Sequence, residues 1–338
     1  MAVYDYIRRC LFKLPPEQAH KLAIAVIKRG CISVSPTPHS NELHQTVMGL
    51  SFPHPIGLAA GFDKDGEALS GLASCGFSHI ECGTVTPLPQ AGNAHPRLFR
   101  LPDQSAIINR MGFNNAGVMA LARRLENRPN NIVLGINIGK NKQTPIAEAI
   151  NDYLFCYRVI YSYADYVTVN ISSPNTENLR DLQTEEWLER MVVAMKNAQS
   201  QLVTRHGRYV PIAIKIAPDL DEQEIANMAK VFNRYHIDAV IATNTTIDKS
   251  AVSMLPYGQE AGGLSGIPLQ AKSTEVIRCL RSHLDNSIPI IGVGGVANSQ
   301  TAQEKLAAGA TLLQLYTAMV YQGPAVLAKI LSGISIPK

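Results

Sequence analysis

The sequence predicts one (β/α)₈ barrel preceded by a short helical extension. Three observations carry this prediction. Eight short apolar or β-branched runs recur between residues 55 and 317, segments of helical character separate most of them, and each run ends in small or polar residues. Strands that alternate with helices form a parallel sheet, and eight such units favour closure into a barrel. A length of 338 residues suits one barrel domain with insertions.

The runs and the segments between them give the order of the elements. The predicted strands are Pro55–Ala60, His79–Thr84, Ile132–Ile138, Tyr166–Ser172, Pro211–Ala217, Ala239–Asn244, Pro289–Val293 and Leu312–Thr317. The clearest predicted helices are Asn115–Leu125, Pro145–Tyr163, Glu185–Leu202, Asp221–Tyr235 and Ser299–Ala308. Three strand-to-helix loops are long, namely 85–114, 172–184 and 245–267. Because loops after the strands form the active-site face of this fold, their length indicates a deep or covered site. A hydrophobic segment, 251–258, has no assignment.

The N-terminal residues form a separate predicted unit. Residues 3–13 and 16–29 have the spacing of amphipathic helices, and residues 30–53 have the composition of a linker. The first 30 residues carry a net charge of +4, equal to that of the whole chain, from Arg8, Arg9, Lys13, Lys21, Lys28 and Arg29 against Asp5 and Glu17. Two interpretations stay open: a helical cap packed on its own domain, or a hairpin on an anionic membrane surface. We expect a helical module over 1–40 and a barrel over 41–338.

Composition excludes several classes of protein. A hydrophobic share of 46% with 17% charged residues describes a globular chain with a large core. No apolar stretch approaches the ~20 residues that cross a bilayer, and no cleavable export signal is visible. Six scattered cysteines without a CxxC pair suit a reducing cytosol and predict no metal site. A neutral body behind a basic N-terminus argues against nucleic acid as a partner.

Small and polar residues gather where the predicted strands end. They are Ala60–Gly61 with Lys64, Thr84, Asn137, Asn170 with Ser173, Lys215, Thr243–Asn244, Gly294–Gly295 and Tyr316–Thr317. Any one of them is ordinary turn chemistry. Eight strand ends of this kind predict a ring of hydrogen-bond donors and two lysines around the mouth of the barrel.

The seventh strand adds a signal for phosphate. Gly292-Val-Gly-Gly295 frees backbone amides where such barrels bind phosphate, although a tight turn explains the motif equally well on its own. No GxGxxG follows the first strand, which disfavours a dinucleotide fold. A phosphate here, with Lys215 near a flat ring, fits flavin mononucleotide (FMN). The asparagine-rich stretches 109–115 and 170–178 suit a heterocycle with alternating C=O and N–H edges.

Several long motifs together resemble the dihydroorotate dehydrogenase family over essentially the whole chain. They are GLAAGFDKDGE (57–67), GTVTPLPQAGN (83–93), PRLFRL (96–101), INRMGFNN (108–115), VNISSPNT (169–176), KIAPDL (215–220), TNTT (243–246), GGLSG (262–266), GVGG (292–295) and QLYTAMVYQGP (314–324). The chain is similar to the quinone-dependent class 2 branch, because Ser173 stands where class 1 enzymes have cysteine and because class 1 enzymes lack the N-terminal extension. Ser173 could not be chosen over Ser172 without this resemblance.

The resemblance implies a role for each matching position. FMN would be held by Ala60, Gly61, Thr84, Asn137, Asn170, Lys215, Thr243, Gly266, Gly295, Tyr316 and Thr317. Dihydroorotate would be held by Lys64, Asn109, Arg110, Met111, Gly112, Phe113, Asn170, Asn175, Asn244 and Thr245. Ser173 would be the catalytic base in oxidation of (S)-dihydroorotate to orotate, a step of pyrimidine (UMP) biosynthesis.

The resemblance also implies an electron acceptor and a location. A membrane quinone would be the final acceptor, and it would enter through the N-terminal helices of a monomer bound peripherally at the cytoplasmic face of the cell membrane. Three alternatives remain at this stage. They are a fumarate- or NAD-linked oxidase, a non-redox barrel with Lys215 as a Schiff-base lysine, and a non-catalytic membrane-surface protein.

Overall fold

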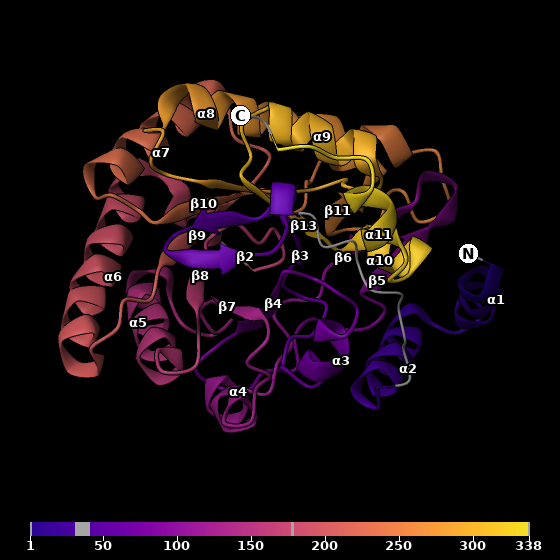
Figure 1. The fold of residues 1–338 in the computed structure, drawn as a ribbon, viewed down its shortest axis with the longest axis horizontal. Helices are drawn as coiled ribbons and strands as arrows, with labels where there is room; N and C mark the ends of the chain where they lie inside the picture. Colours follow the sequence, from indigo (N-terminus) through magenta and orange to yellow (C-terminus); the bar gives the residue numbers. More distant parts are fainter. Residues whose placement is uncertain (1, 31–40, 177–178, 337–338) are drawn as a thin grey trace.

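The computed structural model describes residues 2–30, 41–176 and 179–336, and its centre is a closed barrel of eight parallel strands (Figure 1). Each strand pairs with the next barrel strand in the chain, and β13 pairs with β3 to close the barrel. The barrel strands are β3 (Ile56–Leu58), β4 (His79–Val85), β7 (Val133–Ile138), β8 (Tyr166–Asn170), β9 (Ile212–Ile216), β10 (Ala239–Ala242), β12 (Ile290–Val293) and β13 (Leu312–Leu315). All eight strands predicted from the sequence are confirmed.

Burial on both faces explains why these strands are visible in the sequence. Every residue of β4, β8, β9, β10, β12 and β13 is buried. Strands of a parallel barrel face side chains inside and helices outside, so they become continuous apolar runs.

Helices cover the outside of the barrel (Figure 1). They are α3 (Leu69–Ala73), α4 (Val118–Leu125), α5 (Ala149–Ile160), α6 (Glu185–His206), α7 (Glu222–Arg234), α8 (Gln270–His283), α9 (Ser299–Ala307), α10 (Thr317–Gln322) and α11 (Val326–Leu331). Local chemistry sets their ends. Asp221 and Glu224 form a capping box at the start of α7, and Gly207 ends α6 in the left-handed conformation.

Two of the long loops contain strands that the sequence did not predict. β5 (Leu98–Leu101) and β6 (Ala106–Asn109) come from the loop 85–114, and β11 (Gly263–Gly266) comes from the loop 245–267. They form an antiparallel sheet in the order β11-β6-β5. The previously unassigned segment supplies part of its core, since Val252 and Leu255 pack with Phe99, Ile108 and Leu264.

The predicted linker also contains regular structure, so that prediction is wrong for its second half. β1 (Gln45–Val47) and β2 (Leu50–Phe52) form an antiparallel hairpin. Val47 and Phe52 pack against Tyr166 and Ala239, which begin two barrel strands. The hairpin therefore covers the end of the barrel opposite the predicted site. Residues 31–40, which include the predicted boundary at residue 40, lie outside the described residues.

The predicted N-terminal helices are α1 (Ala2–Leu11) and α2 (Pro16–Lys28), which lie beside α3 and α10 (Figure 1). Tyr4 donates to the Val320 carbonyl at 2.7 Å, and the Arg8 guanidinium donates to the Tyr321 carbonyl at 2.7 Å. Arg97 of the loop before β5 pairs with Glu17 of α2 at 3.0 Å. Across the described ranges, the structure contains no helix with the length and apolarity needed to span a membrane.

Candidate active site

A cavity that is open to solvent lies at the C-terminal ends of the barrel strands. Its lining comes from the loops that follow these strands and from the small β11-β6-β5 sheet. Nearly all of the predicted site residues line it: Ala60, Gly61, Lys64, Thr84, Asn109, Met111, Gly112, Phe113, Asn170, Ser173, Asn175, Lys215, Thr243, Asn244, Thr245, Gly266, Gly295, Tyr316 and Thr317. The fold thus brings together residues that are up to about two hundred and fifty positions apart, as closure of a barrel requires.

Two predicted residues, Asn137 and Arg110, do not line this cavity. Asn137 is fully buried behind Thr84, whose hydroxyl donates to Asn137 Oδ1 at 2.5 Å. Arg110 pairs with Glu260 at 2.8 Å and lies over the Phe99 ring, which directs its guanidinium to the small antiparallel sheet. Asn137 thus contacts a residue of the cavity lining, whereas the side chain of Arg110 contacts residues outside it.

A chain of amide and hydroxyl groups links the ends of β4, β8 and β10. Asn170 Nδ2 donates to Thr84 Oγ1 at 3.0 Å, and Asn244 Nδ2 donates to Asn170 Oδ1 at 3.3 Å. Buried groups of this kind hold their orientation because each lost hydrogen bond leaves an unsatisfied polar atom. The network therefore fixes the amides that face the cavity.

The two adjacent serines have different surroundings. The Ser172 hydroxyl is fully buried, donates to Asn170 Oδ1 at 3.0 Å and accepts from Asn244 Nδ2 at 3.0 Å. Ser173 lines the cavity, and its Oγ accepts a 3.3 Å hydrogen bond from the backbone N–H of Asn175. Of this pair, Ser173 is the one whose hydroxyl borders the space open to a ligand.

A buried carboxylate below the cavity was missed by the sequence reasoning. Glu81, on β4, is fully buried inside the barrel. Burial lowers the pKa of Lys215, while the charge of Glu81 acts to raise it. The signal in the sequence was an acidic residue within an otherwise apolar strand run, HIECGTV. A charge at such a position is rare unless it is paired or hydrogen-bonded.

Lys64 belongs to two cavities. With Met111 it lines both the main cavity and a second one between α2 and the loop after β3. Burial, followed by the nearby charge of Arg97, lowers the pKa of Lys64 to about 8. His20 of α2 lines the second cavity, and burial with the charge of Lys64 lowers its pKa to about 4.

The cavity has features that fit FMN. Gly294 and Gly295 have φ angles of +114° and +72°, and a Cβ on Gly295 would lie 2.7 Å from the backbone nitrogen of Gln270. Such glycines let backbone approach a phosphate closely. Gln314 also lines the cavity, and its buried Oε1 finds no hydrogen-bond partner among the described residues. An unsatisfied acceptor, a lysine and several amides suit the polar edge of a flavin ring.

The fold and this cavity are those of a (β/α)₈-barrel enzyme, a class whose active sites lie at the C-terminal face of the barrel. The family model for dihydroorotate dehydrogenase matches residues 42–336, so the chain belongs to the dihydroorotate dehydrogenase family.

Relatives and solved structures agree on the branch of this family. A dihydroorotate dehydrogenase (quinone) of Thiobacillus denitrificans is 53% identical over 95% of this chain and 96% of its own length. One from Methylobacillus flagellatus is 51% identical over the same shares. The crystal structure of dihydroorotate dehydrogenase from Eimeria tenella in complex with ferulenol has a TM-score of 0.89 and 36% identity, and the match covers 94% of this chain and 90% of that one. The chain is thus an enzyme of the quinone-dependent class 2 branch.

Proposed function

We propose that this protein oxidises (S)-dihydroorotate to orotate with FMN as cofactor and a membrane quinone as final electron acceptor, in pyrimidine (UMP) biosynthesis. One observation carries the proposal: Ser173, Lys64 and the asparagines border the same cavity as Lys215 and the Gly294–Gly295 turn. When bound, FMN supplies the hydride acceptor.

The substrate part of the cavity would be formed by Lys64 and the polar loops. The Lys64 ammonium supplies a cation for the substrate carboxylate, and the asparagine amides supply donors and acceptors for the ring. Asn175 Nδ2 donates to Asn109 Oδ1 at 3.4 Å, so the two asparagine-rich loops meet in the cavity. The rest of this part would be formed by Met111, Gly112, Phe113 and Thr245. Arg110 would contribute indirectly, by holding the loop that carries Asn109 and Met111.

Ser173 would remove the proton from C5 of the substrate. A serine hydroxyl is a weak base at neutral pH, so it needs charge stabilisation close to the reacting atoms. Lys64 and the amides of Asn170 and Asn244 border the same space and would stabilise negative charge that develops on the substrate.

The cofactor part would lie deeper, over the strand ends. Lys215 and Gln314 would face the polar edge of the flavin, and the turn at Gly294–Gly295 would receive the phosphate. Asn137 would act through Thr84, from whose hydroxyl it accepts a hydrogen bond. The other residues of this part are Ala60, Gly61, Asn170, Thr243, Gly266, Tyr316 and Thr317.

The N-terminal helices would carry the quinone site and the membrane contact. The second cavity lies beside α2 and shares Lys64 and Met111 with the main cavity, so a quinone bound at this side would lie next to the proposed cofactor site. Apolar side chains on the outer face, including Tyr6 at 71% and Leu22 at 47% exposure, accompany the basic charge of this region. Apolar and basic residues together favour an anionic membrane surface, so we propose a peripheral monomer at the cytoplasmic face.

The visible spectrum tests the proposal. The purified protein should show a flavin absorbance band that bleaches when dihydroorotate is added without oxygen, and a quinone analogue should restore the band. Fumarate or NAD should not restore it. A protein with no flavin band would contradict the proposal and favour a non-redox barrel, and a band that dihydroorotate leaves unchanged would contradict the proposed substrate.

A further inference from the structure

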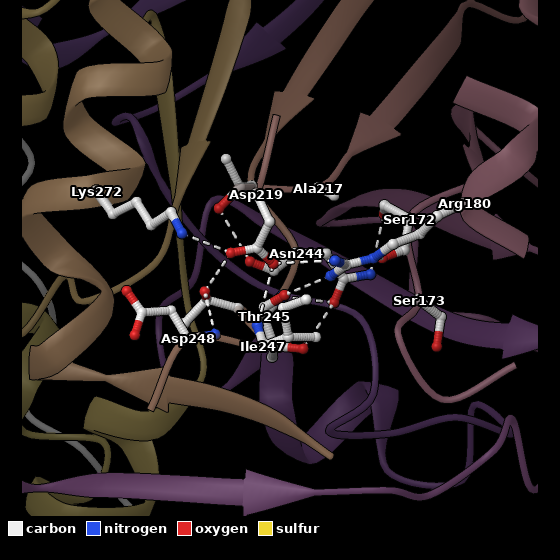
Figure 2. A network of polar contacts seen from close by, with 12 residues as sticks. Ser172, Ser173, Arg180, Ala217, Asp219, Asn244, Thr245, Ile247, Asp248 and Lys272 are labelled. Carbon is white, nitrogen blue, oxygen red and sulfur yellow. Dashed lines mark hydrogen bonds and ion pairs between the residues drawn. The ribbon is translucent and has the colours of Figure 1, made fainter. Parts of the chain in front are cut away.

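A cluster of charged side chains joins three loops outside the cavity lining (Figure 2). Its centre is Asp219, which follows β9 and has a side chain only 10% exposed. Arg180 reaches it from the short helix η4 (Leu179–Gln183), and Lys272 reaches it from α8. Figure 2 shows Asp219 between Lys272 and Arg180, with Ser172 beside Arg180.

Both carboxylate oxygens of Asp219 are fully used. Oδ1 accepts from Lys272 Nζ at 2.6 Å and from the Thr246 hydroxyl. Oδ2 accepts from Arg180 Nη1 at 3.0 Å and from the backbone N–H of Ile247 at 3.0 Å. Burial acts to raise the pKa of Asp219, but the hydrogen bonds from Lys272, Thr246, Ile247 and Arg180 outweigh it and lower this pKa. Asp219 is therefore an ionised anchor between β9 and the loop after β10.

The remaining nitrogens of Arg180 hold two loops that form the cavity. Nε donates to the Ser172 carbonyl at 3.3 Å, and Nη2 donates to the Thr245 carbonyl at 3.1 Å. The Ser172 carbonyl belongs to the peptide that leads into Ser173, and Thr245 lines the cavity. One planar guanidinium thus fixes the backbone beside Ser173 relative to the backbone of Thr245. Its charge is held in place by Asp219.

We propose that Arg180 and Asp219 are a positioning pair that sets the distance between Ser173 and the substrate side of the loop after β10. This inference rests on the proposed function, because it assumes that Ser173 is the base. Neither side chain lines the cavity, so the pair acts through the backbone of Ser172 and Thr245.

The physical argument is one of precision. Proton transfer needs the base within hydrogen-bond reach of the proton, and a misplacement of about 1 Å costs up to about 100-fold in rate. Among the described residues, the Oγ of Ser173 has one hydrogen bond, a long one of 3.3 Å that it accepts from the backbone N–H of Asn175. The position of its backbone therefore decides where the hydroxyl lies. Arg180 binds the two carbonyls and the carboxylate from three different nitrogens of one rigid plane. A lysine has all three of its donors on a single rotatable nitrogen, so it cannot hold these acceptors in the same geometry.

The test compares Arg180→Lys and Asp219→Asn with a matched control, Asp165→Asn, in the FMN-loaded full chain. Asp165 also pairs with an arginine, Arg128, at 2.7 Å, and its side chain is 19% exposed. It immediately precedes β8 and so lies at the opposite end of the barrel from Ser173. Each of the three variants alters one member of a partly buried ion pair, and the control does so far from the cavity.

Three quantities are measured for each variant. They are the rate of flavin bleaching by dihydroorotate in stopped flow, the affinity for orotate from the change in flavin absorbance, and amide hydrogen exchange in residues 172–176 and 244–247. We expect Arg180→Lys and Asp219→Asn to slow bleaching by about 10-fold to 100-fold. Orotate affinity should fall much less, since Lys64 and Asn109 are untouched, and exchange should rise in both peptides.

Asp165→Asn should lower the melting temperature and leave the bleaching rate within about twofold of the unmodified protein. The proposal is overturned if the Arg180 and Asp219 variants bleach at the original rate, or if the Asp165 variant slows bleaching as much as they do. Failure of the proposed function gives a different result, because dihydroorotate would then not bleach the unmodified protein.

Discussion

Asn137 Nδ2 donates a 2.8 Å hydrogen bond to Glu81 Oε1 inside the closed barrel. The other carboxylate oxygen accepts from Tyr166 at 3.1 Å, from Thr168 at 3.0 Å and from Gln314 Nε2 at 3.0 Å. Glu81 is thus buried with four donors around it, on the strand that also carries Thr84. This polar layer lies directly under the residues proposed to hold FMN, and it replaces the apolar packing that usually fills a barrel of this kind.

Glu81→Leu should destabilise the fold, because it leaves several buried donors without an acceptor. We expect the free energy of unfolding to fall by about 3 kcal/mol or more, measured by denaturant titration. Glu126→Leu, at the exposed end of α4, should change it little. Equal losses in both variants would mean that the buried network contributes nothing specific.

Replacement of Ser173 by alanine should separate chemistry from cofactor binding. Removal of a general base typically costs about 100-fold to 10,000-fold in rate, so Ser173→Ala should bleach very slowly with dihydroorotate while it retains FMN. Ser172→Ala is the informative neighbour, since its hydroxyl is bound to Asn170 and Asn244 instead. If Ser172→Ala lost more of the bleaching rate than Ser173→Ala, the assignment of the base would be wrong.

Binding of orotate should weaken as the pH rises through about 8, the value to which the pKa of Lys64 is lowered. Below this pH the ammonium is charged and attracts the carboxylate of orotate, and above it the amine is neutral. Lys64→Arg keeps its charge across this range and should remove the dependence. The measurement is the dissociation constant of orotate from pH 6 to about pH 9.5. This range ends below the usual lysine pKa, so lysines with an ordinary pKa stay charged throughout it. An unchanged pH dependence in Lys64→Arg would assign it to another group.

Gly295→Ala should reduce the FMN content of the purified protein. The added Cβ would meet the backbone of Gln270 at 2.7 Å from its nitrogen and would distort the proposed phosphate turn. Gly207→Ala is a matched control, because Gly207 has a similar φ of +67° with nothing within 4 Å of the added atom. Both alanines would have a similar positive φ, so a loss of FMN in both variants would assign the loss to backbone strain and not to the added Cβ.

Contact with membranes should depend on the outer face of α2. Leu22 and Val26 are one helical turn apart and are 47% and 37% exposed. Replacement of both by glutamate should lower binding to vesicles of anionic lipid by about tenfold or more. The change removes two apolar side chains and adds negative charge, which the anionic lipid repels. Met254→Glu changes a side chain that is 95% exposed on a barrel loop and should bind as before. Equal binding by all three proteins in a flotation assay would contradict the membrane contact.

The barrel, its eight strands and most of the residues around the cavity could be predicted from the sequence alone. It could do so because burial on both faces leaves a continuous apolar run for each strand, and because the ends of parallel strands all meet at one rim. A local pattern is sufficient for both inferences. The family motifs then added the expected role of each residue at that rim.

Contacts between residues far apart in the chain depend on the tertiary fold and could not be predicted. Glu81 and Gln314 are 233 positions apart, and only closure of the barrel brings them together. The β11-β6-β5 sheet has strands of only 4 residues each, too short for a period of two to stand out in the sequence. It forms because two separate loops meet. In the same way, Ser172 and Ser173 are alike in sequence. They differ because the fold buries one hydroxyl against Asn170 and exposes the other to the cavity, where a ligand could reach it.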